Sequence, residues 1–186
     1  MEAFGQDAAD CMFNNDAKEL SLIIDKLSKH VQDQLQDIAH VVDVIFKWVS
    51  VVISQSTNTP LIIKLYDFLA NLFSELMATG YQLWDHEAYV IVLMFCEKSG
   101  NNNALVKNKI KTLIRACFPM YDHVKCATLI IDFISASKNL KSIAECLEEI
   151  ACLVEKQGTQ SISEKQIRMI AKLLEHSDSG VRKGAY

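Results

Sequence analysis

Residues 137–158 read SKNLKSIAECLEEIACLVEKQG, and this stretch decides the fold. It begins as a short basic turn and continues as a helix, because its apolar residues recur every three or four positions. These residues are Leu140, Ile143, Leu147, Ile150 and Val154. Gly158 is predicted to cap the C-terminal end of the helix, where a left-handed backbone favours glycine. The stretch is therefore a polar turn that leads into an amphipathic helix.

The same arrangement recurs along the whole chain. An apolar helix is followed by a short turn with Asn or Ser and a Lys or Arg, and then by a second apolar helix. The spacing of about 40 residues is the period of HEAT-type helical repeats. Strand-like alternation is nearly absent, and the chain has only 6 glycines and 2 prolines. The pattern predicts an all-α protein, an α-solenoid of HEAT-type helical hairpins.

The expected helices are bounded by turn residues and by changes in apolar spacing. They cover residues 17–34, 37–53, 60–79, 84–96, 104–118, 119–136, 140–157 and 162–176, after a first helix that ends within 7–13. Residues 181–186 begin a helix of about one and a half turns, which is too short to be stable alone. We therefore expect a single domain over residues 1–186 that is a fragment of a longer protein, or a shortened form with an incomplete last repeat.

Several side chains are assigned to the core or to the surface by their helical spacing. In the helix over 37–53 the predicted core residues are Val41, Val44, Ile45, Trp48 and Val52. Trp84 is expected to pack between repeats, because large aromatic side chains are usually mostly buried. Leu105 is also expected in the core. One face of the helix over 104–118 carries a basic row, which is expected to be solvated or to meet an acidic partner: Lys107, Lys111 and Arg115.

Composition and charge exclude several classes of protein. The chain has 186 residues, of which 50% are hydrophobic and 23% charged, as in ordinary globular proteins. Its net charge of −4 argues against a nucleic-acid-binding protein, which would be strongly basic. Residues 1–10 lack the basic and apolar regions of a secretory signal, and no window reaches the ~18 apolar residues of a membrane span. A soluble intracellular protein with no nucleic-acid or membrane partner is expected.

The cysteines are expected to be reduced thiols in a chain without a secretory signal. There are 6 of them, and most fall on apolar helix faces, where cysteine behaves as a small hydrophobic residue. The alternative is a metal site formed by Cys117, His123 and Cys126. No Cys-x-x-Cys pair accompanies them, so no metal is expected.

No catalytic motif is present. The chain has no phosphate-binding glycine-rich loop, Gly-x-Ser-x-Gly motif or His-Glu-x-x-His pair. None of the 5 histidines has a Cys or Asp at a local spacing that suggests catalysis. We therefore expect no catalytic residues, no cofactor and no enzyme activity.

Positive charges recur at or just after the predicted turns. In stacked hairpins the turns within each pair line up along one edge, so their charges would form a single basic ridge. Such a ridge suits a large acidic partner through electrostatic steering and charge-assisted hydrogen bonds. The alternative is that Lys and Arg simply populate exposed loops, and both interpretations stay open. The residues concerned are Lys18, Lys64, Lys107, Lys138, Lys141 and Arg182.

Six segments, in this order and at these spacings, resemble the TOG domains of the ch-TOG/Msps microtubule polymerases, most of all the fourth-type domain of the array. The resemblance covers nearly the whole chain. The segments are 12–18 (MFNNDAK), 46–48 (FKW), 57–64 (TNTPLIIK), 137–139 (SKN), 144–149 (AECLEE) and 181–182 (VR).

The resemblance implies a flat paddle of HEAT repeats whose intra-repeat turns bind αβ-tubulin at microtubule ends, without catalysis. It also implies a cytoplasmic, cytoskeletal location at microtubules, spindle and centrosome, with other microtubule-associated proteins as further partners. Arg182, as the family's fifth-turn arginine, would form a charge-assisted bond to an acidic residue of tubulin. The tubulin-binding residues implied by the resemblance are Lys18, Asn58, Lys64, Val106, Lys107, Lys138, Lys141, Val181 and Arg182.

The chain departs from the family pattern at two positions. Ala17 stands where the family places an aromatic residue at the first turn, and an aromatic anchor is a typical hot spot of a protein interface. Ile143 stands where a basic residue is expected after the fourth turn. The alternative function is a HEAT-repeat scaffold that binds a regulatory or centrosomal protein through its helix faces, without tubulin contact.

Overall fold

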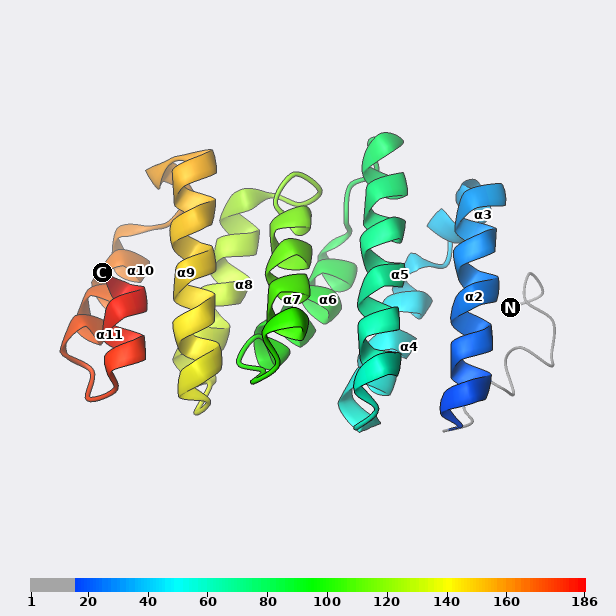
Figure 1. Cartoon of the computed structure of the whole chain (residues 1–186). Helices are drawn as coiled ribbons and strands as arrows, with labels where there is room; N and C mark the ends of the chain where they lie inside the picture. The colour runs from blue at the N-terminus through cyan, green and yellow to red at the C-terminus, as the bar shows by residue number, and fades with distance from the viewer. Residues whose placement is uncertain (1–15) are drawn as a thin grey trace. The chain divides into compact units, whose positions relative to one another are not determined.

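The computed structural model describes residues 16–186 and divides the chain into two compact units (Figure 1). Unit 1 ends at Tyr81, and unit 2 covers Gln82–Tyr186. Every regular element among the described residues is a helix, so the all-α prediction is confirmed there. The first helix, predicted to end within 7–13, lies outside the described residues.

Unit 1 contains four described helices. They are α2 (Ala17–Asp33), α3 (Leu35–Ala39), α4 (Val42–Gln55) and α5 (Thr59–Ala78). Helices α2 and α5 lie side by side (Figure 1). Between α4 and α5, Phe46 and Phe73 meet edge to face with ring centroids 5.6 Å apart, and both side chains are completely buried. Trp48 is also buried, as predicted.

The helix expected over 37–53 is broken. The helix α3 ends at Ala39, and the chain leaves helical backbone geometry at Val41, which has φ −124° and ψ 14° and offers no side-chain cap. Because the helical register restarts at Val42, the buried face is rotated, and Val44 is 49% exposed rather than in the core. No Gly or Pro marks this break in the sequence.

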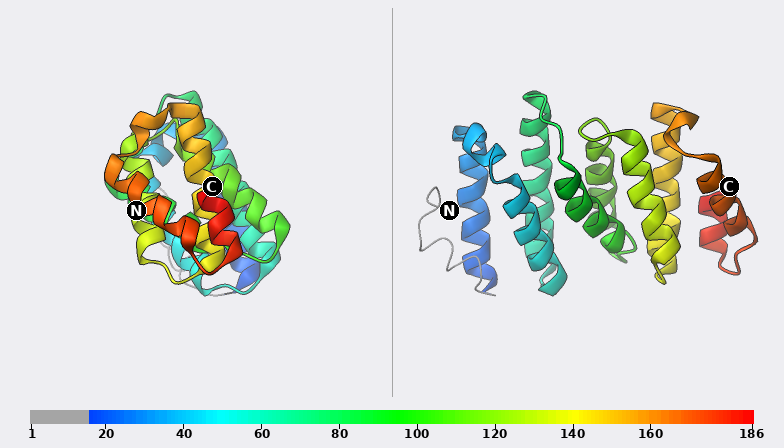
Figure 2. Two further views of the ribbon diagram at one scale, coloured as in Figure 1. Left: turned by 90° about the vertical axis from the view of Figure 1, so that its left-hand side faces the viewer. Right: turned by 180° about the vertical axis from the view of Figure 1, so that it is seen from behind.

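Unit 2 is built from two layers of helices (Figure 2), with α6, α8 and α10 in one layer and α7, α9 and α11 in the other. Four of its five free cysteines, from α6 to α9, are buried in its core, in agreement with their predicted role as small hydrophobic residues. The elements are α6 (Asp85–Lys98), α7 (Ala104–Cys117), α8 (His123–Ala136), α9 (Leu140–Gln157), the 3-10 turn Thr159–Ser161, α10 (Glu164–Lys172), the 3-10 turn Leu173–Glu175 and α11 (Ser179–Ala185).

One local device starts each helix that follows a predicted turn. An Asp or Asn residue with an extended backbone precedes the helix, and its side-chain oxygen accepts hydrogen bonds from backbone N–H groups of the first turn, which have no helical partner. Asn139, for example, accepts from the N–H groups of Lys141 and Ser142. The capping residues are Asp16 for α2, Asn58 for α5, Asn103 for α7, Asn139 for α9 and Asp178 for α11.

Three predictions about individual residues of unit 2 are wrong. Pro119 lies in a turn before α8 rather than at the start of that helix, which begins after the Asp122 cap. Trp84 is 67% exposed, because it precedes α6 as its N-cap residue and faces outward. Leu105, in the first turn of α7, is 53% exposed. By contrast, Gly158 does end α9 with a positive φ of 90°.

No helix among the described residues is long and apolar enough to cross a membrane.

The close contact between α9 and α11 depends on Gly184, because glycine has no Cβ atom. A Cβ atom at Gly184 would lie 2.9 Å from the backbone oxygen of Ala144 and 3.1 Å from the Cβ of Leu147. At Gly180, in the same helix, a Cβ would meet only the flexible Asp178 side chain at 3.1 Å and the Cβ of Ala144 at 3.8 Å. We infer that α11 can approach α9 this closely only with glycine at position 184.

We expect Gly184→Ala to destabilise the packing of α11 by about 1–3 kcal/mol, as other overpacking substitutions do. Amide hydrogen exchange across residues 179–185 measures this effect directly. The matched control Gly180→Ala should leave protection unchanged or raise it, because Ala is the better helix former. Equal protection in both variants would show that the close approach does not hold α11.

Candidate protein-binding site

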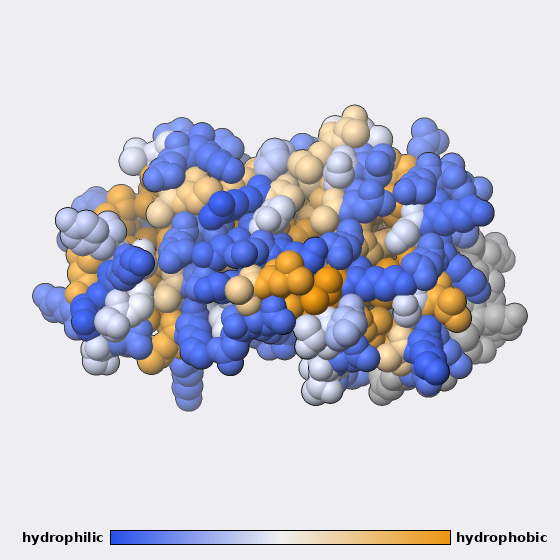
Figure 3. All heavy atoms as spheres, viewed as in Figure 1, coloured by the Kyte–Doolittle hydropathy of each residue, from blue (hydrophilic) through white to orange (hydrophobic). Residues whose placement is uncertain are grey.

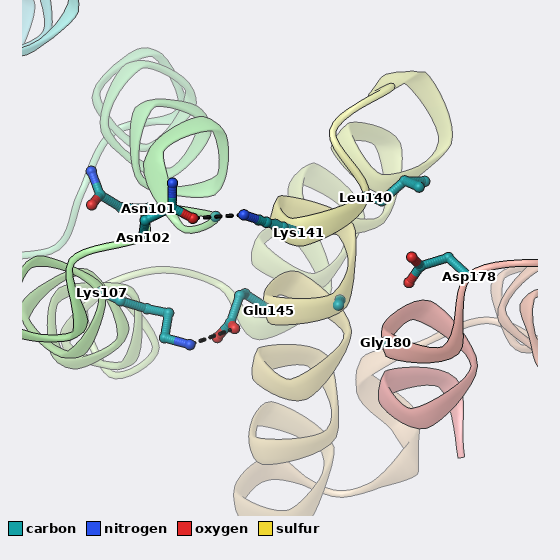
Figure 4. Close-up of a pocket in the computed structure, with 10 residues that line it drawn as sticks. Asn101, Asn102, Lys107, Leu140, Lys141, Glu145, Asp178 and Gly180 are labelled. Carbon is teal, nitrogen blue, oxygen red and sulfur yellow. Dashed lines mark hydrogen bonds and ion pairs between the residues drawn. The ribbon is translucent and has the colours of Figure 1, made fainter.

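Three consecutive turns of unit 2 form a groove of about 350 Å³ (Figure 4). The turn between α6 and α7, the first turn of α9 and the start of α11 all contribute to it. This places side chains that are about 40 residues apart in the sequence on one surface. The lining residues are Gly100, Asn101, Asn102, Lys107, Leu140, Lys141, Ala144, Glu145, Asp178 and Gly180.

The backbone around the turn between α6 and α7 is bound to α9 through the Ser142 hydroxyl. Buried Ser142 accepts a hydrogen bond from Gly100 N at 3.2 Å and donates one to Glu97 O at 3.0 Å. A Cβ at Gly100 would lie 2.7 Å from Ser142 N, so only glycine fits here. The groove wall is therefore fixed by the fold rather than by loop side chains.

Lys141 is the predicted cation that lies most directly in this groove. It follows the Asn139 cap, is exposed, and its Nζ donates to Asn102 Oδ1 at 2.6 Å. A neutral amide partner leaves the positive charge uncompensated. Lys141 can therefore exchange Asn102 for a carboxylate at little cost.

Lys107 lines the same groove but is already paired. Its Nζ lies 3.0 Å from Glu145 Oε1, and Lys111 Nζ lies 2.7 Å from the other oxygen of Glu145 and 2.6 Å from Glu148 Oε2. Arg115 adds two bonds to Glu149, from Nε at 2.7 Å and from Nη2 at 3.0 Å. The basic row of α7 thus meets an acidic row on α9 of the same chain.

These ion pairs shift the pKa values of their members. Partial burial raises the pKa of Glu145, but the hydrogen bonds from Lys111 and Lys107 outweigh it and hold that pKa below its ordinary value. Partial burial lowers the pKa of Lys111, but Glu145 and Glu148 raise it overall. The hydrogen bonds to Glu149 raise the pKa of Arg115. All three shifts favour the charged forms, so the ion pairs of Lys107, Lys111 and Arg115 with the glutamates of α9, here called the charge ladder, are stable near neutral pH.

Arg182 lies in the first turn of α11 and is exposed, but its guanidinium turns back onto its own turn. Nη1 donates to His176 O at 2.7 Å and to Ser177 O at 2.8 Å. These bonds hold the side chain in one place without neutralising it. The neighbouring Val181 is completely buried, and Val106 at the start of α7 is 2% exposed. The two valines therefore support their turns, and their side chains have almost no surface to offer a partner.

Lys138 lies in the turn between α8 and α9, and its side chain is exposed. Within the described residues, no ion pair of Lys138 is found. Figure 3 shows many hydrophilic residues on the side of the molecule that Figure 1 presents, together with a hydrophobic patch near the middle of the view. The turns of unit 2 thus combine free cations, Lys138 and Lys141, with the anchored Arg182.

Unit 1 places the other three predicted residues beside a second groove, of about 470 Å³, between the first turns of α2 and α5. Lys18 is exposed, and Asn58 serves as the cap of α5. Lys64 crosses from α5 to α2, where its Nζ bonds Ser21 O at 3.0 Å, Ser21 Oγ at 2.7 Å and Asp25 Oδ2 at 2.7 Å. Lys64 is therefore largely engaged in holding the two helices together.

Sequence reasoning missed two features. The acidic residues Glu145, Glu148 and Glu149 were not identified as partners of the basic row, although two of them are spaced four apart on one helix, as are Lys107 and Lys111. Leu22, on α2 beside the second groove, is 62% exposed; it lies off the buried stripe of Leu20, Ile23 and Ile24, so its helical spacing could have placed it on the outer face.

The alternative metal site is not formed. Among residues 16–186, no group of three or more His, Cys, Asp or Glu side chains is placed to hold a metal ion. Cys117 and Cys126 are buried, and burial raises the pKa of Cys126 to about 12 and that of Cys117 as well. They are thus protonated thiols in the core.

Comparison with known proteins gives two kinds of relative. No family model matches the chain. Over 183 residues the chain is 28% identical to Protein MOR1 of Oryza sativa subsp. japonica, covering 98% of the chain and 9% of that protein. It is 26% identical to Protein mini spindles of Drosophila melanogaster over 94% of the chain and 8% of that protein. The chain thus spans less than a tenth of the length of these curated relatives.

Two solved structures share the fold. One is described as "TOG-tubulin binding specificity promotes microtubule dynamics and mitotic spindle formation" and has a TM-score of 0.91 and 25% identity, over 97% of this chain and 73% of that chain. The other, a TOG domain structure from C. elegans Zyg9, has a TM-score of 0.88 and 18% identity, over 96% of this chain and 66% of that chain.

The chain is therefore a HEAT-type helical solenoid, as predicted. It shares this fold with the two TOG-domain structures and is similar in sequence to segments of MOR1 and mini spindles.

The Arg115–Glu149 pair gives a first test of the ladder. We expect Arg115→Met to lower the free energy of unfolding by about 2–4 kcal/mol, because it leaves the completely buried Glu149 carboxylate without its cation. The double variant Arg115→Met/Glu149→Leu should recover much of this loss, since it removes the stranded charge. Urea denaturation measures both, and no recovery in the double variant would contradict the role given to Glu149.

The acid dependence of stability gives a second test. The pKa of Glu145 is lower in the folded chain than its ordinary value of 4.5. Its ion pairs therefore stabilise the fold above pH 4.5, and this contribution is lost as pH falls through the lowered pKa. We expect the free energy of unfolding to fall less steeply below pH 4.5 in Glu145→Gln than in the unmodified chain. Identical slopes would show that Glu145 does not titrate as stated.

Proposed function

We propose that this chain is a non-catalytic αβ-tubulin-binding module that acts in microtubule growth and spindle organisation. The observation that carries the proposal is its similarity, at a TM-score of 0.91 over 97% of the chain, to a structure described by its TOG–tubulin binding specificity. The full-length similarity to segments of MOR1 and mini spindles gives further support. The corresponding location is cytoplasmic, at microtubules, spindle and centrosome.

We further infer that residues 1–186 form one TOG domain of a longer array protein, most like the fourth-type domain. The partners are αβ-tubulin or microtubule ends, with other microtubule-associated proteins as further candidates. No cofactor and no catalytic step enter this proposal, because binding through turns requires only complementary charge and shape.

The groove of unit 2 suggests how the predicted residues divide their roles. Lys138, Lys141 and Arg182 keep a net positive charge available to an acidic partner. Lys107 shares its charge with Glu145, so it contributes to the groove mainly by fixing α7 against α9. Val106 and Val181 are buried, and they hold their turns in position by packing against the core.

We expect the double variant Lys141→Glu/Arg182→Glu to weaken αβ-tubulin binding about tenfold or more, because each change replaces an attraction with a repulsion. Sedimentation or size exclusion at low and moderate salt measures this loss. Binding of the unmodified chain should also fall with added salt, since exposed charges are screened over about 8 Å at physiological ionic strength.

The matched control is Lys165→Glu/Lys172→Glu on α10, which changes the net charge equally but lies outside the groove. We expect it to bind as the unmodified chain does. Equal weakening by both double variants would show that the overall charge of the chain, and not the groove, causes the loss of binding. Lys107→Glu is unsuitable as a probe, because it would set two carboxylates against each other at Glu145.

A second candidate function is the scaffold that binds a regulatory or centrosomal protein. It is favoured by two exposed aromatic side chains, Trp84 at the N-cap of α6 (67% exposed) and Tyr89 within α6 (58% exposed). Beside them Asp85 binds Lys125 at 2.8 Å and Tyr121 at 3.0 Å. In the same tubulin assay, Trp84→Ser should have no effect under the first proposal. The scaffold, which makes no tubulin contact, would instead be favoured if the unmodified chain bound no αβ-tubulin even at low salt.

A further inference from the structure

The turn that leads into α11 holds the side chain of Arg182 in place. Arg182 Nη1 donates to the backbone oxygens of His176 at 2.7 Å and of Ser177 at 2.8 Å. These two residues lie between the 3-10 turn Leu173–Glu175 and α11. The direction of their carbonyl groups, and with it the position of the guanidinium, therefore depends on the conformation of residues 176–178.

The side chain of His176 fixes that conformation. The backbone N–H of Asp178 donates to His176 Nδ1 at 3.0 Å, and both residues are half-buried. At one end of the turn, His176 N donates to Leu173 O at 3.1 Å. At the other end, Asp178 Oδ1 accepts from Val181 N at 3.0 Å and so starts α11. The imidazole ring thus closes the turn whose carbonyl groups bind Arg182.

The bond to Nδ1 is possible in only one protonation state of His176. A backbone N–H group can only donate, so Nδ1 must present its lone pair, and the neutral ring carries its proton on Nε2. In the imidazolium form both ring nitrogens are donors and neither can accept. Histidine is the side chain whose charge ordinarily changes between about pH 5 and 8. Acidification within this range removes the acceptor of the Asp178 N–H group.

Protonation also changes the charge beside Arg182. The charged side chains of the surrounding segments are Lys172 at the end of α10, Glu175 in the 3-10 turn, Asp178, and Arg182 and Lys183 in α11. The α9 residues that face α11 here, Ala144 and Leu147, are uncharged. An imidazolium would place a positive charge on the residue whose carbonyl oxygen binds the guanidinium, and it would attract the Asp178 carboxylate away from its role as the cap of α11. Both effects act against the turn that holds Arg182.

We propose that His176 is the positioning residue of Arg182, and that its protonation releases the guanidinium and weakens partner binding as the pH falls from about 7.5 to 6. The inference rests on the proposed function and takes αβ-tubulin as the partner. At the higher pH, Arg182 is held ready for an acidic residue of that partner. At the lower pH its side chain is free to move, and ordering it on binding costs conformational entropy.

Two variants of the full chain separate the acceptor from the ring. His176→Asn keeps an acceptor oxygen but cannot be protonated in this range, whereas His176→Leu has no acceptor. Affinity for αβ-tubulin is measured at about pH 7.5 and 6. We expect the unmodified chain to bind about 3–10-fold more weakly at the lower pH, the Asn variant to bind equally well at both, and the Leu variant to bind weakly at both.

The matched control is His86→Asn. His86 is exposed in the first turn of α6 and does not line the groove of unit 2, so this variant should show the same pH dependence as the unmodified chain. Because αβ-tubulin and the other histidines also titrate, the quantity compared is the difference between each variant and the unmodified chain. Melting temperatures at both pH values show that each variant is folded.

The outcomes separate this inference from the proposed function. Equal pH dependence in His176→Asn and the unmodified chain would overturn the inference, as would full affinity of His176→Leu at about pH 7.5. Weak binding by His176→Asn at both pH values would also overturn it, because a neutral acceptor should be sufficient. If Lys141→Glu/Arg182→Glu still weakens binding in these cases, the proposed function stands. No tubulin binding by the unmodified chain at either pH would reject both.

Discussion

The charge ladder between α7 and α9 is the interaction on which the site of unit 2 depends. Each hairpin can bury its apolar face only against the next one, so their relative register decides where the turns lie. Lys107, Lys111 and Arg115 fix this register by reaching three glutamates of α9. The innermost pair is costly to break, because Glu149 is completely buried and its bonds to Arg115 are what make that burial tolerable. The groove of Figure 4 is thus framed by a salt-bridge network.

The ladder also decides which cations remain for a partner. A lysine that already shares a carboxylate brings little additional attraction, and breaking its pair would leave that carboxylate facing the incoming acid. Lys141 and Arg182 instead bond neutral oxygen atoms, which hold the side chains in place while their charge stays available. This arrangement pre-orders long side chains that would otherwise lose conformational entropy on binding. The attraction of this surface for an acidic partner therefore depends on the cations that are not already paired, and not on the number of basic residues at the turns.

Much of the fold was predictable from the sequence, and the failures share a cause. Helical spacing and turn residues located most of the helices, since apolar periodicity and Asx caps are local signals. The break at His40–Val41 and the exposure of Trp84 and Leu105 depend on how helices pack, which no local pattern encodes. For the site, the basic turns were recognised but not their partners. The glutamates that engage Lys107 and Lys111 lie 38 and 37 residues away in the sequence.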